Sequence, residues 1–155
     1  MITLTSTLVV KAGVTLATVG LPLRTQYAKQ ARLVRGAPFG TNELDSALVR
    51  LESGARLDSV WVSGQAQVYP YHNPGVNVVL RSGTGTTLAN ARLDNSTGWT
   101  SAVAHHYGAP CSAMALTGNL ITGYSNDHHY TDAPFGYTPM ESAATAATSR
   151  QATTT

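Results

Sequence analysis

Charged residues are scarce in this sequence. They make up 12% of its 155 residues, about half the share in a typical soluble domain. Ten Lys and Arg stand against eight Asp and Glu, which gives a formal net charge of +2. Such a small charge does not indicate nucleic acid as a partner. The scarcity of charge also argues against a coiled coil, which needs Glu and Lys at regular spacing. The 43% apolar fraction argues against a long disordered chain, so we expect one compact domain.

Cysteine is nearly absent, since Cys111 is the only one, and no disulfide can form within the chain. The same count excludes a zinc site built from several cysteines. No apolar run reaches the roughly 18 residues that a membrane helix needs, and the segment after Met1 does not resemble a secretory signal. We therefore expect no membrane partner, and we expect Cys111 to be a small core residue.

Short segments rich in β-branched residues are separated by turn residues along most of the chain, as in sandwiches and barrels. The predicted strands are 2–10, 14–19, 46–52, 57–63, 76–81, 87–93, 113–117 and 119–124. We expect the first two to form a hairpin or one bent strand, and the last two to pair as a hairpin. Segment 27–34 is expected to be a short helix or a loop. Val60, Trp61 and Val62 are predicted to lie in the core.

The C-terminal part differs in composition from the rest. Residues 124–140 concentrate aromatic side chains beside two prolines and a glycine, which favours an ordered loop, and residues 141–155 offer nothing to bury. We therefore predict a β-sandwich domain over 1–123, followed over 124–155 by an aromatic loop and a tail that is flexible unless a partner orders it. The sequence shows no internal repeat.

One stretch of the sequence resembles the discoidin-like or galactose-binding-like family. It contains SALVRLE over 46–52, the turn SGA, RLDSVWVSG over 56–64, the strand 76–81 and DNSTGWTS, in which Trp99 takes the aromatic place. The opening STLVVKAGVTL is similar to the start of small sandwiches encoded by tailed bacteriophages. The resemblance implies an all-β, antiparallel jelly-roll β-sandwich with an extended C-terminal loop and tail. Members of this family usually carry an aromatic residue soon after the first loop, but residues 32–36 of this chain contain none. The sugar and calcium sites of the family are therefore not assigned to residues of this chain.

Histidines supply the only candidate metal ligands of note. These candidates, with one carboxylate beside them, are His105, His106, Asp127, His128 and His129. One histidine from each pair could join Asp127 on a divalent ion, although loop histidines bonded to backbone or lying at a subunit contact are the simpler interpretation. Asp94, Asp127 and Asp132 lack a spacing that predicts an acid–base pair. We therefore predict no enzyme activity, no metal and no cofactor.

Aromatic side chains near prolines favour a contact surface. The predicted partner-contact residues are Tyr69, Tyr71, Tyr124, Tyr130, Phe135 and Tyr137. For Tyr69 and Tyr71, core packing of one ring is an equal alternative. With the low charge and the phage-like opening, these residues favour a bacteriophage virion structural protein, most simply a capsid cement or decoration protein that stabilises the head.

The partners of such a protein would be the major capsid protein or other virion proteins, and further copies of the chain, in a virion assembled in the host cytoplasm. One alternative is a head-to-tail or tail component of the particle. Another is a carbohydrate-binding receptor-recognition module, which would use Trp99, or Tyr69 and Tyr71, to stack on sugar rings.

Overall fold

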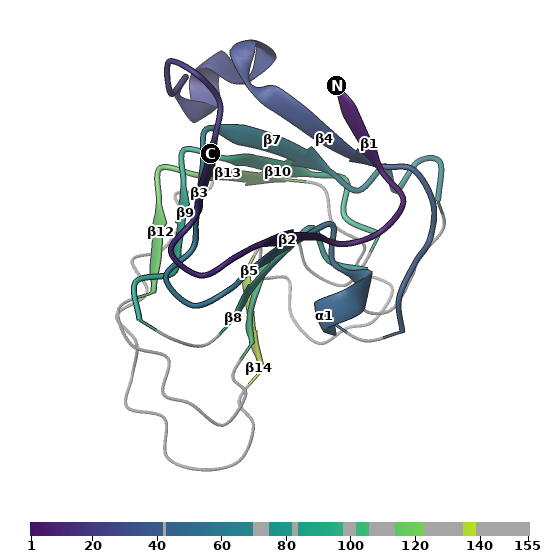
Figure 1. The fold of residues 1–155 in the computed structure, drawn as a ribbon. Helices are drawn as coiled ribbons and strands as arrows, with labels where there is room; N and C mark the ends of the chain where they lie inside the picture. The colour runs from purple at the N-terminus through teal and green to yellow at the C-terminus, as the bar shows by residue number, and fades with distance from the viewer. Residues whose placement is uncertain are drawn as a thin grey trace.

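The computed structural model describes residues 1–41, 43–69, 75–81, 84–97, 102–105, 114–122 and 135–138. Within them the chain winds in successive coils around one core, and the strands of these coils stack into three parallel sheets (Figure 1). This architecture is a β-solenoid. The three sheets form three sides around the core, and the N-terminal coil lies at one end of the stack.

Each sheet takes at most one strand from each coil. Sheet A contains β1 (Ile2–Leu4), β4 (Ala31–Arg35), β7 (Val60–Ser63), β10 (Arg92–Asp94) and β13 (Leu120–Thr122). Sheet B contains β2 (Leu8–Val10), β5 (Val49–Leu51), β8 (Val78–Arg81), β11 (Ala102–His105) and β14 (Phe135–Thr138). Sheet C contains β3 (Thr15–Ala17), β6 (Arg56–Asp58), β9 (Thr87–Ala89) and β12 (Ala115–Thr117). Two short helices complete the described elements, the 3₁₀ helix η1 (Arg24–Lys29) and α1 (Glu43–Ser46).

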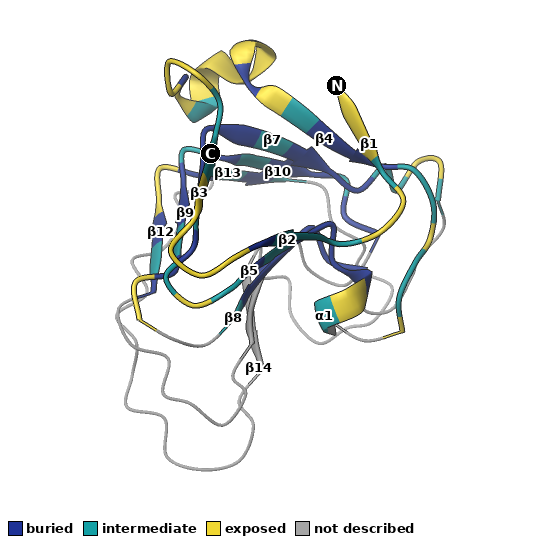
Figure 2. Ribbon diagram, viewed as in Figure 1, coloured by how far each residue is buried: buried dark blue, intermediate teal, exposed yellow. Residues whose placement is uncertain are grey.

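Apolar side chains of equivalent strand positions stack inside the solenoid. Alternate strand residues point to opposite faces, so a strand of three residues can direct its central side chain inward. In sheet C the stacked residues are Leu16, Leu57, Leu88 and Leu116. In sheet A they are Leu33, Val62, Leu93 and Ile121. Both stacks belong to one hydrophobic core, whose middle coils are buried (Figure 2).

The corners between sheets C and A depend on single residues with a left-handed backbone. Ser59 follows β6 with φ of 56°, Asn90 follows β9 with φ of 49°, and Gly118 follows β12 with φ of 64°. Short polar residues and glycine tolerate this conformation, which turns the chain sharply from one sheet into the next. At Gly118 a Cβ atom would also lie only 2.7 Å from Asn90 Oδ1, so glycine is required there.

The predicted antiparallel jelly-roll β-sandwich is wrong. Every strand pairing in the described residues is parallel, from β1 with β4 in sheet A to β3 with β6 in sheet C. Most predicted strands lie where strands are found, but 2–10, 57–63 and 87–93 each divide at a corner into strands of two sheets. The two predicted hairpins are wrong for the same reason, because β2 and β3, like β12 and β13, belong to different sheets.

Three other predictions from the sequence changed with the fold. Val60 and Val62 are buried as predicted, whereas Trp61 between them lies on the outer face of sheet A and is only half-buried. The segment expected to be a short helix or a loop contains the end of η1 and most of β4. The aromatic C-terminal segment, expected to be a loop, contributes β14 to sheet B. The boundary between residues 123 and 124 stays a prediction.

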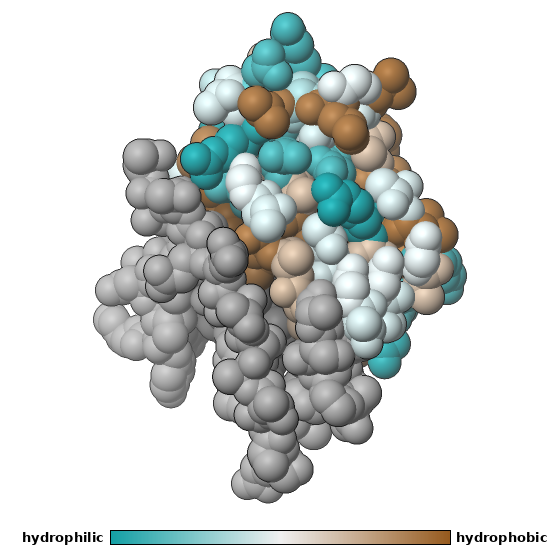
Figure 3. Space-filling model, turned by 90° about the vertical axis from the view of Figure 1, so that its left-hand side faces the viewer, coloured by the Kyte–Doolittle hydropathy of each residue, from teal (hydrophilic) through white to brown (hydrophobic). Residues whose placement is uncertain are grey.

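The structure is repetitive although the sequence shows no repeat. Successive inward residues of sheet A, from Leu33 to Ile121, are separated by 29, 31 and 28 residues. The connecting segments differ in length and each coil needs only a few apolar positions, so the repeat is mainly geometric. Residue identity keeps a short trace of it, because Ala-Arg-Leu occupies equivalent positions of sheet A at 31–33 and 91–93. Seen from the side of sheet C, the described surface mixes hydrophilic and apolar residues (Figure 3).

Candidate functional site

The first coil, residues 1–23 with β1, β2 and β3, forms an open end of the solenoid. Each of its strands lies at the edge of its sheet, paired on one side with β4, β5 or β6. No segment among the described residues pairs with the opposite edges. Three strands therefore present unpaired backbone N–H and C=O groups side by side, which is the arrangement that accepts a further strand.

Apolar side chains gather at the same end. Figure 2 shows much of the first coil in yellow, the colour of exposed residues. Of the eight large hydrophobic side chains that are exposed in the described residues, six belong to the first coil: Met1, Ile2, Val14, Val19, Leu21 and Leu23. Leu4, Leu8 and Leu16 are only partly buried, although they pack on the core. A further layer over this end would therefore bury apolar surface that the chain leaves in contact with water.

The first coil is almost free of charge. Lys11 is the only charged side chain in residues 1–23, and it follows β2 at the corner before β3. Two such surfaces can approach each other with little like-charge repulsion and little cost of desolvating ions. The open end thus combines unpaired strand edges, exposed apolar groups and low charge.

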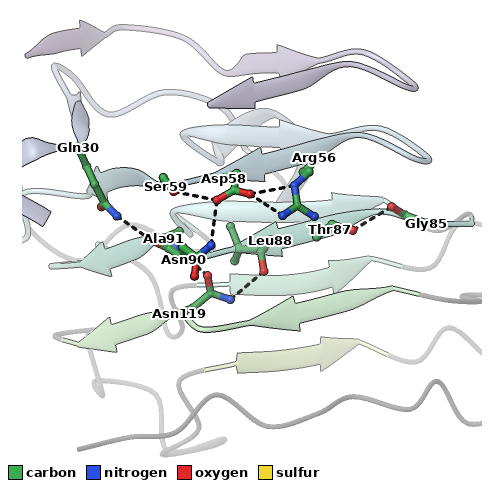
Figure 4. A network of polar contacts seen from close by, with 10 residues as sticks. All are labelled: Gln30, Arg56, Asp58, Ser59, Gly85, Thr87, Leu88, Asn90, Ala91 and Asn119. Atoms are coloured by element: carbon green, nitrogen blue, oxygen red, sulfur yellow. Dashed lines mark hydrogen bonds and ion pairs between the residues drawn. The ribbon is translucent and has the colours of Figure 1, made fainter. Parts of the chain in front are cut away.

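A polar network at the corners between sheets C and A connects the coils along the solenoid (Figure 4). Asp58 Oδ1 accepts hydrogen bonds from Ser59 Oγ at 2.8 Å and from Asn90 Nδ2 at 3.1 Å. In the next coil Asn119 Nδ2 donates to the carbonyl of Leu88 at 2.9 Å, and Asn119 Oδ1 accepts from the N–H of Ala91. These side chains satisfy backbone and side-chain groups of successive corners, which is a structural role.

The electrostatics of Asp58 agree with that role. Burial opposes ionisation of its carboxyl group, but hydrogen bonds from Arg56, Ser59 and Asn90, with the charge of Arg56, outweigh burial and lower its pKa below 3.8. Arg56 Nη2 lies 2.5 Å from Asp58 Oδ2. A carboxylate held ionised and occupied by three donors is unsuited to act as a general acid at neutral pH.

Arg35 is the one fully buried cation among the described residues, and it joins segments that connect sheets A and B. Its Nη2 donates to the carbonyl of Ser46 at 2.9 Å, and its guanidinium carbon lies 4.6 Å from the centre of the Phe39 ring. Burial lowers the pKa of Arg35 to about 10, and Tyr69 opposes that shift. Arg35 therefore stays charged at neutral pH and holds backbone carbonyls together.

Three of the predicted partner-contact residues are described by the structure, and none of them belongs to the first coil. Tyr69 is half-buried, and its hydroxyl donates to the carbonyl of Gly36 at 2.6 Å. The backbones of Phe135 and Tyr137 pair, in β14, with those of Ala102 and Ala104. Three of these predicted residues lie outside the described part of the chain: Tyr71, Tyr124 and Tyr130.

The histidine hypothesis concerns residues that are mostly outside the described ranges. His105 belongs to β11, whereas His106, Asp127, His128 and His129 are not described, and neither are Trp99 and Cys111. In the part of the chain that the structure describes, no three His, Cys, Asp or Glu side chains come together as metal ligands would. None of the described helices is long and apolar enough to cross a membrane.

The sequence did not identify the open end as a surface, because its segments were interpreted as a hairpin or one bent strand. A signal was present in the run of residues 1–23 that holds many large apolar side chains and one charge. Comparisons of the chain with protein-family models, with curated proteins and with solved structures found no match.

Proposed function

We propose that this chain is a structural protein that associates with a second copy of itself through the first coil. The observation that carries this proposal is the set of three edge strands at one end of the solenoid, surrounded by exposed apolar side chains. Pairing of these edges would satisfy backbone N–H and C=O groups that no described segment of the chain pairs with.

A second copy suits this end better than a charged partner does. The first coil carries only Lys11, so it offers almost no charge for a complementary partner to recognise, whereas its apolar surface is complementary to itself. A two-fold axis perpendicular to the solenoid would place the edge strands of the two copies antiparallel, a direction in which strands pair well. Leu4, Leu8 and Leu16 would then be covered by the same residues of the other copy.

Sedimentation velocity over a range of micromolar concentrations tests this proposal. Ile2 is 55% exposed on β1 and lies opposite Leu33, so Ile2→Lys places a charge at the open end of the sheet A stack. We expect the unmodified chain to form dimers and this variant to dimerise about tenfold more weakly, because a charge would be buried at the contact.

The matched control is Val68→Lys, because Val68 is 60% exposed and lies outside the first coil. This variant should dimerise like the unmodified chain. A chain that stays monomeric over the whole range, or an equal loss of association in both variants, would contradict a contact through the first coil.

The narrower expectation, a capsid decoration protein or a tail component of a bacteriophage, stays a prediction. It draws support from the low charge of the chain, and a self-associating protein with few charges suits a repeated array in which many weak contacts add. Binding of the purified chain to assembled capsids or tails, followed by electron microscopy of the particle, is the direct measurement.

A further inference from the structure

A row of cationic and aromatic side chains crosses the outer face of sheet A on β4, β7 and β10. Arg32 of β4, Trp61 of β7 and Arg92 of β10 occupy equivalent positions on neighbouring strands. The next residue of each strand, Leu33, Val62 or Leu93, points into the core, so the row itself points outward. The helix η1 adds Tyr27 to this row.

The side chains of the row are in contact with one another. The guanidinium carbon of Arg32 lies 4.1 Å from the centre of the Trp61 ring, and that of Arg92 lies 4.9 Å from the same centre and 4.1 Å from the Tyr27 ring. The two rings meet edge to face with centroids 5.1 Å apart. Cation–π contacts of this kind hold the guanidinium groups in fixed positions.

The two arginines of the row differ in how their charge is balanced. Asp94 Oδ2 accepts hydrogen bonds from Arg92 Nε and from Trp61 Nε1, each at 2.9 Å. Arg32 has no carboxylate partner among the described residues, and its Nε is buried without a hydrogen-bond partner. Arg92 and Asp94 form a neutral pair, whereas the charge of Arg32 is left uncompensated.

The helix η1, whose Tyr27 contacts the row, carries further cations. Lys29 is exposed at the end of this helix, and Arg24 donates from Nη1 to the carbonyl of Asn119 at 2.7 Å, which places it beside β13. Among the described residues, Asp94 is the carboxylate that bonds to this row, and it pairs with Arg92. Stacking on Trp61 explains why Arg32 is ordered, but it does not supply the negative charge that a half-buried guanidinium favours.

We propose that this face of sheet A binds an acidic polysaccharide, with a carboxylate or sulfate group of the sugar paired to Arg32. Arg32 and Arg92 lie two strands apart, about 10 Å along the solenoid, so a ligand that spans the row is extended and places one anionic group at Arg32. The exposed part of the Tyr27 ring offers an apolar surface for the C–H groups of a sugar.

A nucleic acid fits this face less well. The net charge of the chain is only +2, and the guanidinium of Arg32 covers a face of Trp61 on which a base would stack. The proposal is independent of the dimer contact, because Tyr27, Arg32 and Trp61 belong to none of the strands of the first coil.

The test measures affinity of the 155-residue chain for alginate, which carries carboxylates, for dextran sulfate and for neutral dextran, by isothermal titration calorimetry. We expect binding to one or both charged polymers, weaker at higher salt, and none to neutral dextran. Arg32→Gln should weaken this binding about tenfold, because a charge-assisted bidentate contact is lost.

Lys11→Gln is the matched control, since it removes one positive charge from the opposite part of the coil and should change the affinity less than about twofold. If Arg32→Gln fails to fold by circular dichroism, Lys29→Gln replaces it, with an expected loss of about twofold to threefold. Binding of neither charged polymer, or equal losses in the Arg32 or Lys29 variant and in the Lys11 variant, overturns the proposal. Equally tight binding of neutral dextran, of polyglutamate or of single-stranded DNA overturns it too.

Discussion

Asp58 shows how a single side chain holds a corner of the solenoid together. Its carboxylate receives hydrogen bonds from Ser59, from Asn90 in the next coil and from Arg56 on the same strand. Its side chain is only 4% exposed, so water replaces few of these contacts if they are lost. Stability at this corner therefore depends on one ionised group.

We expect Asp58→Asn to lower the free energy of unfolding by about 2 kcal/mol at pH 7, because an amide satisfies fewer of these donors and removes the charge that faces Arg56. Urea denaturation measures this loss. The control is Glu52→Gln, in which the carboxylate is 19% exposed and pairs with Arg50 and Arg81, and which should cost less than about 1 kcal/mol. Equal losses in both variants would contradict a special role for Asp58.

The same prediction has a pH dependence with a definite sign. The pKa of Asp58 is lower in the folded chain than the ordinary value of 3.8, so its ionised form stabilises the fold above that pH. This contribution is lost as the pH falls through the lower folded value. The difference in stability between the unmodified chain and Asp58→Asn should therefore be constant near neutral pH and shrink below about pH 4.

At the scale of elements, the strands are too short to be stable alone and depend on stacking. Strands of three to five residues make few hydrogen bonds each, but every middle strand is paired on both sides and adds at least one side chain to the core. The leucine stack of sheet C shows a gradient, because Leu57 and Leu88 are fully buried whereas Leu16 in the first coil is partly buried. Inner coils therefore carry more of the core than the open end does.

Leu57→Ala and Leu16→Ala should separate the inner coils from the open end. The first leaves a cavity between two coils and should cost about 3 kcal/mol, whereas the second removes a half-exposed side chain and should cost about 1 kcal/mol. Thermal or urea unfolding at a concentration where the chain is monomeric measures both values. A cost at Leu16 as large as at Leu57 would mean that the open end is already covered in solution.

At the scale of the whole molecule, the solenoid has ends that differ from its middle. A stack of coils in which each contacts only its neighbours has its lowest local stability at an uncovered end. The face of sheet A and the open end are separate surfaces, one cationic and aromatic, the other apolar. The molecule therefore has room for two interactions that do not compete.

Amide hydrogen exchange should reveal this difference between end and middle. We expect amides of β1, β2 and β3 to exchange faster than those of β7, β8 and β9 in the monomer, because opening the end strands breaks pairing on one side only. Raising the protein concentration should slow exchange in the first coil and leave the middle coils unchanged. Uniform exchange rates along the described strands would contradict this expectation.

The sequence predicted the class of structure and most strand positions, but not how the strands pair. Val60 and Val62 were recognised as core residues because a dense apolar strand has few other interpretations. Trp61 was misplaced, because a continuous apolar run resembles a strand covered on both faces, whereas the ring lies under Arg32 and Arg92 on the outer face. The residues of the candidate sugar site come from three coils that are distant in the sequence, so no local sequence motif could predict the site.

The sequence by itself determined that the chain is all-β, low in charge and built from short segments with an apolar core, because composition and alternation follow directly from which side chains are buried. Only the tertiary structure decided between a sandwich and a solenoid. Side chains alternate between the two faces of a strand in the same way in parallel and antiparallel sheets, so the sequence pattern does not distinguish the two. The corners, such as those at Ser59, Asn90 and Gly118, turn the chain into the next sheet and so leave neighbouring strands parallel. The same corners decide which strand edges stay open and which arginines meet, and hence where the molecule can bind.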